Sequence, residues 1–185
     1  KEQSKVKSEG IMGEKRTVDI IIPVYNALDD LKICVESIKT NTDLTKHNLI
    51  ILNDKSTDPE VWPYMQSLRG DNIRVFNNEK NLGFSGNINK GIVVSNNDVI
   101  LLNSDTIVTK EWVEKMASCA YSDPAIGTVT PMSNNATLCS VPKFCEENKL
   151  PKGFTVERYA KLIEECSLEQ YPSIPVAHGF CMYIK

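Results

Sequence analysis

Residues 97–106, with the sequence NDVILLNSDT, join a short apolar run to a cluster of polar side chains that ends in a carboxylate. The run at 99–102 has strand length and no polar alternation, which predicts a buried β-strand. Open α/β folds bind ligands at the carboxyl ends of such strands. Asp105 is therefore a candidate metal ligand, because a hard divalent cation binds carboxylate oxygens and a diphosphate can supply its other ligands. The alternative is that Asp105 or Thr106 caps a turn or the next helix.

Length and composition predict one soluble domain. The chain has 185 residues, of which 41% are hydrophobic and 24% charged, and its net charge is −3 with no long run of one sign. These values argue against a nucleic-acid partner and against binding to an anionic membrane surface. No apolar run approaches the roughly 20 residues that span a bilayer, and the first residues of the sequence lack the apolar stretch typical of a signal peptide. We expect no membrane segment in this chain.

The six cysteines lack paired CxxC spacing, and most have apolar neighbours. This pattern predicts buried free thiols in a reducing compartment rather than disulfides or a zinc site. We therefore expect a cytoplasmic location, with any contact to the inner face of a membrane made by parts of the protein outside this chain.

Strands and helices alternate along the chain. Residues 1–16 are polar and aperiodic, and we expect a linker from a larger parent protein that is disordered at its start. Apolar runs at 18–22, 49–52, 73–76 and 99–102 predict strands, and the segments between the runs favour helices. Such alternation predicts an α/β fold with a mainly parallel sheet over residues 17–185. The strand ends then meet at one edge, and they carry Tyr25 and Asn26, Asn53 and Asp54, Asn77 and Asn78, and Asn103, Ser104 and Asp105.

Local signals predict several boundaries. Asp58 before Pro59, and likewise Thr109 and Thr155, have the residue types of helix N-caps. A glycine-bearing loop is expected at 81–87 before a helix at 88–94, and further strands at 126–129 and 176–184. The irregular residues 131–151 are expected to form a flap that faces an acceptor.

The two histidines are not prime candidates for chemistry. His47 precedes a strand on the opposite edge and is expected at the surface. His178 lies beside an apolar strand, where a structural role is commoner than metal binding or proton transfer.

The loop after the first strand excludes two classes of nucleotide site. Residues 23–27, PVYNA, contain no glycine, whereas a dinucleotide-binding fold needs GxGxxG there, and the chain has no Walker loop. What remains is a nucleotide held by an aromatic ring, a carboxylate that binds a base edge, and a metal that neutralises a diphosphate.

Four motifs resemble, in order and spacing, those of GT-A-fold family-two glycosyltransferases: PVYN at 23–26, NDKSTD at 53–58, NLGFSGNINKG at 81–91 and LLNSDT at 101–106. The resemblance covers residues 17–185, and its glycine loop is most similar to the rhamnosyltransferase-like branch that builds bacterial surface polysaccharides. It implies a Rossmann-like three-layer sandwich whose nucleotide-sugar-binding domain is incomplete at the C-terminus.

The resemblance also implies roles for single residues. Asp54 would accept the N3–H of uracil or thymine, and Asp105 would bind a divalent cation, Mg²⁺ or Mn²⁺. Asn53 and Asn103 depart from the family, because each replaces an acid and so removes charge. The other positions implied to bind substrate are Pro23, Val24 and Tyr25 around the nucleoside, Asn103 and Ser104 at the ribose, and Asn26, Asn81, Gly83 and Asn87.

The activity that the resemblance implies is metal-assisted transfer, with inversion, of a sugar from a UDP- or dTDP-sugar donor to a saccharide or lipid-linked acceptor. The general base of the family is expected beyond residue 185, so no residue is named for it, and this fragment is expected to bind donor better than it turns donor over. Two alternatives remain. One is a non-catalytic sugar-nucleotide-binding module of a larger protein. The other is a sugar-nucleotide pyrophosphorylase, which needs a glycine-rich basic loop that 23–26 does not provide.

Overall fold

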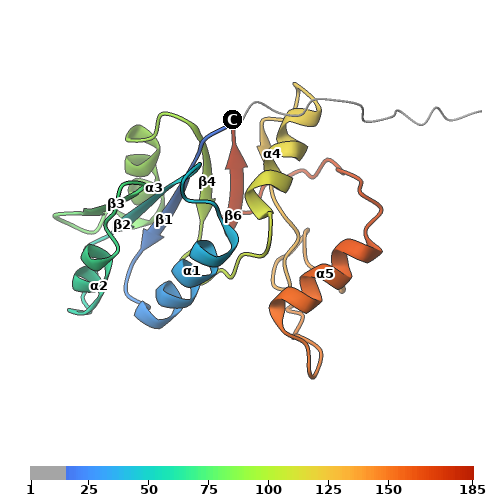
Figure 1. The fold of residues 1–185 in the computed structure, drawn as a ribbon, viewed down its shortest axis with the longest axis horizontal. Helices are drawn as coiled ribbons and strands as arrows, with labels where there is room; N and C mark the ends of the chain where they lie inside the picture. Colours follow the sequence, from blue (N-terminus) through green and yellow to red (C-terminus); the bar gives the residue numbers. More distant parts are fainter. Residues whose placement is uncertain (1–15) are drawn as a thin grey trace, which may run out of the picture.

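The computed structural model describes residues 16–185 and shows a six-stranded sheet with helices on both faces (Figure 1). The strand order is β3-β2-β1-β4-β6-β5. Strands β1 to β4 are parallel to one another, β6 runs antiparallel to β4, and β5 runs antiparallel to β6. The strands are β1 Val18–Val24, β2 Asn48–Asn53, β3 Ile73–Asn77, β4 Asp98–Leu102, β5 Thr128–Val129 and β6 Cys181–Ile184. The predicted mainly parallel α/β sandwich is confirmed.

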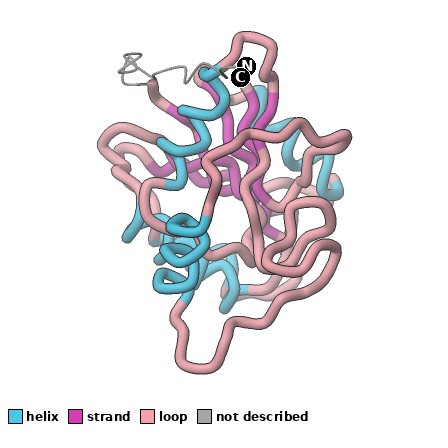
Figure 2. The backbone as a smooth tube through the Cα atoms, turned by 90° about the vertical axis from the view of Figure 1, so that its right-hand side faces the viewer, coloured by secondary structure: helices cyan, strands magenta, loops and turns pink. Residues whose placement is uncertain are grey.

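Two apolar clusters lie on opposite faces of the sheet. The larger cluster joins the sheet to α1, α2 and α4, whereas the smaller one joins it to α3. The helices are α1 Leu28–Asn41, α2 Val61–Ser67, α3 Gly83–Val93, α4 Trp112–Ser122 and α5 Val156–Cys166. In Figure 2, viewed from the side of α4 and α5, irregular loops cover much of this side of the molecule. The arrangement therefore has three layers.

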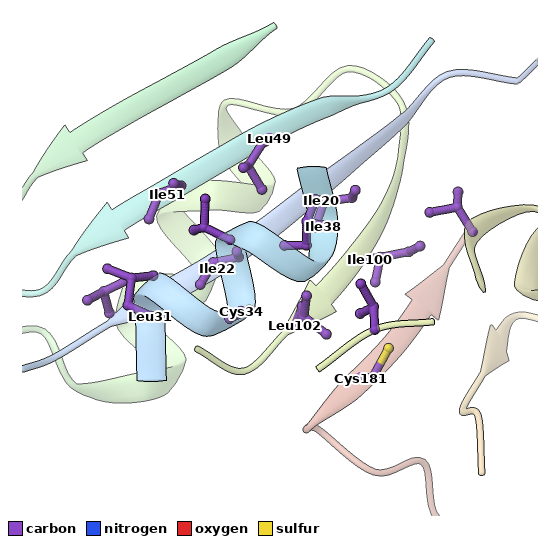
Figure 3. Close-up of a cluster of buried hydrophobic side chains, with 14 of the residues drawn as sticks. Ile20, Ile22, Leu31, Cys34, Ile38, Leu49, Ile51, Ile100, Leu102 and Cys181 are labelled. Atoms are coloured by element: carbon purple, nitrogen blue, oxygen red, sulfur yellow. The ribbon is translucent and has the colours of Figure 1, made fainter. Parts of the chain in front are cut away.

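The central strands are apolar throughout because both of their faces are covered. In β1, Ile20 and Ile22 belong to the larger cluster and Ile21 belongs to the smaller one, as the two-residue period of a strand requires. Figure 3 shows α1 lying across the strands, with Leu31 and Ile38 among the buried side chains. This double coverage explains why continuous apolar runs predicted the strands correctly.

Helix α3 begins at Gly83, five residues before the predicted start at residue 88. The two glycines of residues 81–87 favoured a loop because of their low helix propensity. Packing overrides that preference, since Asn87 and Ile88 are buried against the sheet. The predicted glycine loop is thus mostly the first turns of a helix.

One of three predicted N-caps is confirmed. The Thr155 side chain accepts a hydrogen bond from the Arg158 backbone N–H at 3.2 Å, at the start of α5. Asp58 instead closes a turn by accepting from the Glu60 N–H at 2.9 Å, and α2 starts only at Val61. Thr109 does not cap α4, which follows Glu111 in the left-handed conformation with no side-chain cap.

The last predicted strands are shorter than their apolar runs suggested. Of residues 176–184, only β6 is a strand, and Val176 is 61% exposed. The reason lies in the partner strand, because β4 ends at Leu102, which pairs with Cys181, so the strand ladder stops there. Likewise β5 is limited to the two residues that pair with β6.

His47 is buried, so its predicted surface position is wrong. The residue is 5% exposed, and its Nδ1 accepts a hydrogen bond from the Val18 backbone N–H at 3.2 Å. Nε2 lies 3.7 Å from a carboxylate oxygen of Glu114 on α4. The ring thereby ties the first strand to the segment that leads into β2.

All six cysteines lie within residues 16–185 and are free thiols. The prediction of burial holds for Cys34 and Cys181 but is wrong for Cys145 and Cys166, which are exposed. Of the predicted linker at 1–16, residues 1–15 lie outside the described residues. Among the helices that the structure describes, none is both long and apolar enough to cross a membrane.

Candidate functional site

The carboxyl ends of β1 to β4 meet at one edge of the sheet. In the ladder register, Val24 pairs with Asn53, and Asn53 pairs with Asn77, so these strand ends are level. Chain order reverses at β1, which has β2 on one side and β4 on the other. Open α/β sheets bind ligands at this kind of switch point. The sequence-predicted strand-end residues are therefore brought to one edge.

Asp54 is held in a fixed orientation just beyond β2. It is 3% exposed, and its backbone N–H donates to the Val24 carbonyl at 2.8 Å. Its Oδ1 accepts two hydrogen bonds of 2.8 Å, from the Asn78 side-chain amide and from the Leu82 backbone N–H. Within residues 16–185, no group donates a hydrogen bond to Oδ2, and this oxygen retains some surface that solvent can reach. Asp54 thus retains one free acceptor oxygen.

Asn87 lies beneath Asp54 rather than on the surface of the site. It is 1% exposed; its Oδ1 accepts from the Asn78 amide at 2.9 Å and its Nδ2 donates to the Leu52 carbonyl at 3.0 Å. The predicted substrate-binding residue therefore has its hydrogen bonds directed into the protein, where it supports Asn78.

Two asparagines connect the loops around the site. Asn26 adopts a φ of 60°, and its Oδ1 accepts from the backbone N–H groups of Thr57 and Asp58 at 2.9 and 3.0 Å. The Asn53 Oδ1 accepts from the Ser56 N–H at 3.0 Å, while its Nδ2 donates to Asn77 Oδ1 at 2.8 Å. An aspartate could not make that second bond, because an ionised carboxylate only accepts.

The first loop exposes an aromatic ring. Tyr25 is 51% exposed and Pro23 is partly exposed, whereas the Val24 side chain is 1% exposed within the larger core cluster. Among the residues predicted to line a nucleoside pocket, Tyr25 and Pro23 thus present side chains to solvent. In the neighbouring loop, Asn81 accepts from the Gly83 N–H at 2.9 Å, and Gly83 has the left-handed φ of 71° that suits glycine.

The end of β4 combines a buried acceptor with an exposed carboxylate. The Asn103 N–H donates to the Phe180 carbonyl at 2.8 Å, and the Thr106 N–H donates to the Asn103 carbonyl at 3.2 Å. Asn103 Oδ1 is buried and has no hydrogen-bond partner in the described part of the chain. Ser104 is partly exposed and Asp105 is exposed. Neither Asp105 nor Thr106 caps the next helix, because α4 starts only at residue 112.

The oxygen atoms at the end of β4 fit a divalent cation only if a bound molecule supplies further oxygen ligands. Residues 16–185 contain no group of three or more His, Cys, Asp or Glu side chains that could hold a metal ion. Asp105 offers hard carboxylate oxygens, and the unpartnered oxygen of Asn103 belongs to the same strand end. Because Mg²⁺ and Mn²⁺ accept one or two carboxylates plus phosphate oxygens, the residues fit a cation that a diphosphate helps to hold.

Two residues of the site were missed as site residues by the sequence analysis. Asn78 is 2% exposed, and its Oδ1 accepts from Lys90 Nζ at 2.7 Å, besides its two donations to Asp54 and Asn87. The polar strand end at Asn78 was an available signal. Lys90 lies within the 81–91 motif but was not singled out, because a lysine on a helix is usually solvated.

The segment predicted as a flap has an ordered internal structure. Asn148 is 7% exposed, and its side chain bonds both the Ser140 hydroxyl and the Lys143 backbone. The ring nitrogens of His178 lie 3.2 and 3.3 Å from the Thr137 hydroxyl. These contacts give His178 a role in joining the loop to the segment before β6, while the acceptor role of the loop stays a prediction.

Comparisons with known proteins agree with this architecture. The sequence profile of the family described as "Glycosyl transferase family 2" matches residues 19–185. An uncharacterised glycosyltransferase, YibD of Escherichia coli K12, is 31% identical over 123 residues, covering 61% of this chain and 33% of that protein. Glycosyltransferase GlyA of Streptococcus pneumoniae is 29% identical over 100 residues, covering 54% of this chain and 14% of that protein. The chain thus spans a third or less of these relatives.

Two solved structures share the fold. The mannosyltransferase PcManGT of Pyrobaculum calidifontis, in complex with GDP-Man and Mn²⁺, has a TM-score of 0.53 and 17% identity, covering 63% of this chain and 36% of that chain. TarS 1–349 of S. aureus, in complex with UDP-GlcNAc, has a TM-score of 0.57 and 18% identity, covering 69% of this chain and 37% of that chain. The likeness supports a GT-A fold.

Proposed function

This chain belongs to glycosyl transferase family 2, and on that premise we propose that it uses a UDP- or dTDP-sugar as donor and a saccharide or lipid-linked hydroxyl as acceptor. The proposal extends to inversion at the anomeric carbon and to a place in surface polysaccharide or glycan synthesis. Assignment to the rhamnosyltransferase-like branch stays a prediction.

The observation that carries the proposal is the free carboxylate oxygen of Asp54. A buried carboxylate that retains one acceptor position suits a ring that offers an N–H donor, as uracil and thymine do at N3. Tyr25 follows Val24, whose carbonyl accepts the Asp54 backbone N–H, so an exposed ring belongs to the loop that is hydrogen-bonded to the Asp54 backbone. Base stacking on an aromatic ring and one directed hydrogen bond together bind a nucleoside.

Asp105 is proposed to hold Mg²⁺ or Mn²⁺ together with the diphosphate of the donor. The complex of PcManGT with Mn²⁺ supports a cation in this fold. The chemistry that such a cation supplies when bound is neutralisation of the charge on the departing nucleoside diphosphate. The residues of this chain orient the donor: Asp54 fixes the base, and the end of β4 fixes the diphosphate. We propose no residue of 16–185 as the general base for the acceptor hydroxyl.

The test is calorimetric titration of the chain with UDP and dTDP, with and without Mn²⁺. We expect binding that Mn²⁺ strengthens, and we expect Asp105→Asn to abolish that strengthening while the fold is retained. Asp71→Asn is the matched control, because Asp71 is an exposed aspartate that precedes β3 at the opposite edge. Metal-dependent binding that Asp105→Asn leaves unchanged would refute the role of Asp105.

A second candidate function is a binding module without turnover. The single carboxylate at the end of β4, where the family resemblance implies two acids, favours this alternative. The discriminating measurement is the slow hydrolysis of a UDP-sugar by the chain with Mn²⁺ and no acceptor. If the unaltered chain releases UDP faster than the Asp105→Asn variant does, the result supports a transferase. Nucleotide binding without any release of UDP supports the binding module.

A further inference from the structure

A chain of hydrogen bonds supports Asp54, and it ends in one group that can only accept and one group that can only donate. At one end is the Leu52 backbone carbonyl, which can only accept. At the other end is the ammonium group of Lys90, which can only donate. Asn87 and Asn78 lie between them, and each is at most 2% exposed.

These two ends determine the orientation of both amides. Asn87 must direct its NH₂ group to the Leu52 carbonyl, which leaves its oxygen facing Asn78 at 2.9 Å. Asn78 must direct its oxygen to Lys90 at 2.7 Å, so its NH₂ group faces Asn87 and Asp54. Reversal of either amide would place two donors or two acceptors in contact.

The same chain determines which oxygen of Asp54 is available. Oδ1 accepts hydrogen bonds from the Asn78 side-chain amide and from the Leu82 backbone N–H. The Asp54 side chain is buried, and these two bonds hold its carboxylate in place. Among the described residues, Lys90 forms no ion pair, so its positive charge acts on the Asn78 amide. A hydrogen bond to a charged donor polarises an amide and strengthens the bonds that the amide donates in turn.

We propose that Asn78 and Lys90 are positioning residues for base recognition: they hold Asp54 so that a single oxygen faces the ring and selects a base with an N–H donor. This inference rests on the proposed function, since it concerns the nucleotide of that same site. It adds two residues that do not touch the ligand themselves.

The test compares UDP with CDP, because the cytosine N3 is an acceptor whereas the uracil N3–H is a donor. The unaltered chain should bind UDP more tightly than CDP. We expect Lys90→Met to weaken UDP binding by about tenfold, the worth of one charge-assisted hydrogen bond, and to leave CDP binding nearly unchanged. Lys90→Arg should keep the preference for UDP, because it retains both charge and donor.

Further variants separate positioning from general damage. Asn78→Leu should reduce the UDP preference as Lys90→Met does, and the double variant should add little, because both residues act through one chain of bonds. Lys39→Met, which removes an exposed lysine of α1, is the control and should leave both affinities unchanged.

The possible results distinguish this inference from the proposed function. Equal weakening of UDP and CDP together with a lower Tm in both the Lys90 and Asn78 variants would assign these residues a purely structural role and overturn the inference. Unchanged UDP preference in folded variants would overturn it as well. If the unaltered chain bound neither nucleotide, the proposed function itself would be refuted, and the inference with it.

Discussion

Asn103 combines two features that bear on the proposed metal site: it is neutral, and its side-chain oxygen is buried without a partner among residues 16–185. We predict that Asn103→Asp lowers the free energy of unfolding by about 1–3 kcal/mol in chelator, because it places an unpaired charge at a buried atom. Added Mn²⁺ should recover much of that loss, because the carboxylate would then have a cation.

Thermal unfolding with chelator and with Mn²⁺ checks this prediction. The control is Asn89→Asp, which introduces the same charge at an exposed position of α3. An Asn103→Asp protein whose Tm responds to Mn²⁺ no more than the control does would show that this strand end does not bind the cation.

His47 predicts a pH dependence of stability. Burial lowers the pKa of the imidazole below its ordinary value of 6.5, and the Glu114 carboxylate opposes that shift only in part. The unfolded chain therefore binds the proton more readily, so the contribution of His47 is complete above about pH 6.5 and is lost as the pH falls below that value. Protonation of Nδ1 would also break the bond from the Val18 N–H.

The measurement is urea unfolding from pH 7.5 to 5. His47→Asn places an acceptor oxygen near the position of Nδ1 and cannot titrate, so its loss of stability over this range should be smaller than that of the unaltered chain. Parallel curves for the two proteins would exclude His47 as the titrating group.

Sequence reasoning found the two carboxylates of the site better than the residues that hold them in place. Asp54 and Asp105 follow apolar strands and so were recognisable from local pattern alone. The part played by Lys90 depends on a contact with Asn78, which lies 12 residues earlier in the chain, and local sequence patterns do not encode such contacts.

Helix α3 approaches the sheet closely because Gly91 has no side chain. A Cβ atom there would lie 2.6 Å from Ile21 Cγ2 and 2.7 Å from Leu52 Cδ1. We predict that Gly91→Ala destabilises the protein by about 1–2 kcal/mol, because overpacking of about 1–3 kcal/mol exceeds the gain of up to about 1 kcal/mol in helix propensity.

Chemical denaturation measures this difference. Gly70→Ala is the control, since a Cβ at Gly70 would meet nothing within 4 Å. Equal stability of the two variants would mean that α3 can move away from the sheet at no cost.

The type of an element was predictable where the burial of the segment itself decides its structure. The boundaries of an element were not predictable where a neighbouring segment decides them. The strands β1 to β4 read as apolar runs because helices cover both faces of the sheet. The start of β6 at Cys181 depends on where β4 ends, and the start of α3 at Gly83 depends on packing against the sheet. Neither dependence is visible in a local window of sequence.

The edge of the sheet opposite the site has its own buried carboxylate, which joins segments far apart in the chain. Asp19 is 0% exposed and accepts from Asn48 at 2.7 Å, from Asn97 at 3.0 Å and from the Ser95 hydroxyl at 2.6 Å, with Arg74 at 3.8 Å. Burial raises the pKa of Asp19, but these hydrogen bonds outweigh it, so the pKa is lowered overall.

We predict that Asp19→Asn lowers the free energy of unfolding at pH 7 by roughly 2–3 kcal/mol, because the hydrogen bonds to a charged acceptor are lost. Since the folded pKa is the lower one, the contribution of Asp19 is present above about pH 4 and is lost as the pH falls further. Urea unfolding at pH 7 and pH 3 checks both parts. Asp71→Asn is the exposed control, and a difference from the unaltered chain that is as large at pH 3 as at pH 7 would refute the role of charge.

Strand β6 lies beside β4 (Figure 1) and has β5 on its other side, although it is the last strand of residues 16–185. During synthesis, β1 to β4 can therefore associate while one side of β4 still lacks its neighbour, and this open edge persists until residues 181–184 leave the ribosome. An unpaired strand edge is a template for association with other chains. Premature termination between residues 102 and 181 would thus release a nascent sheet that already carries Asp54 but is prone to aggregate, which gives a cell a physical reason to degrade such products quickly.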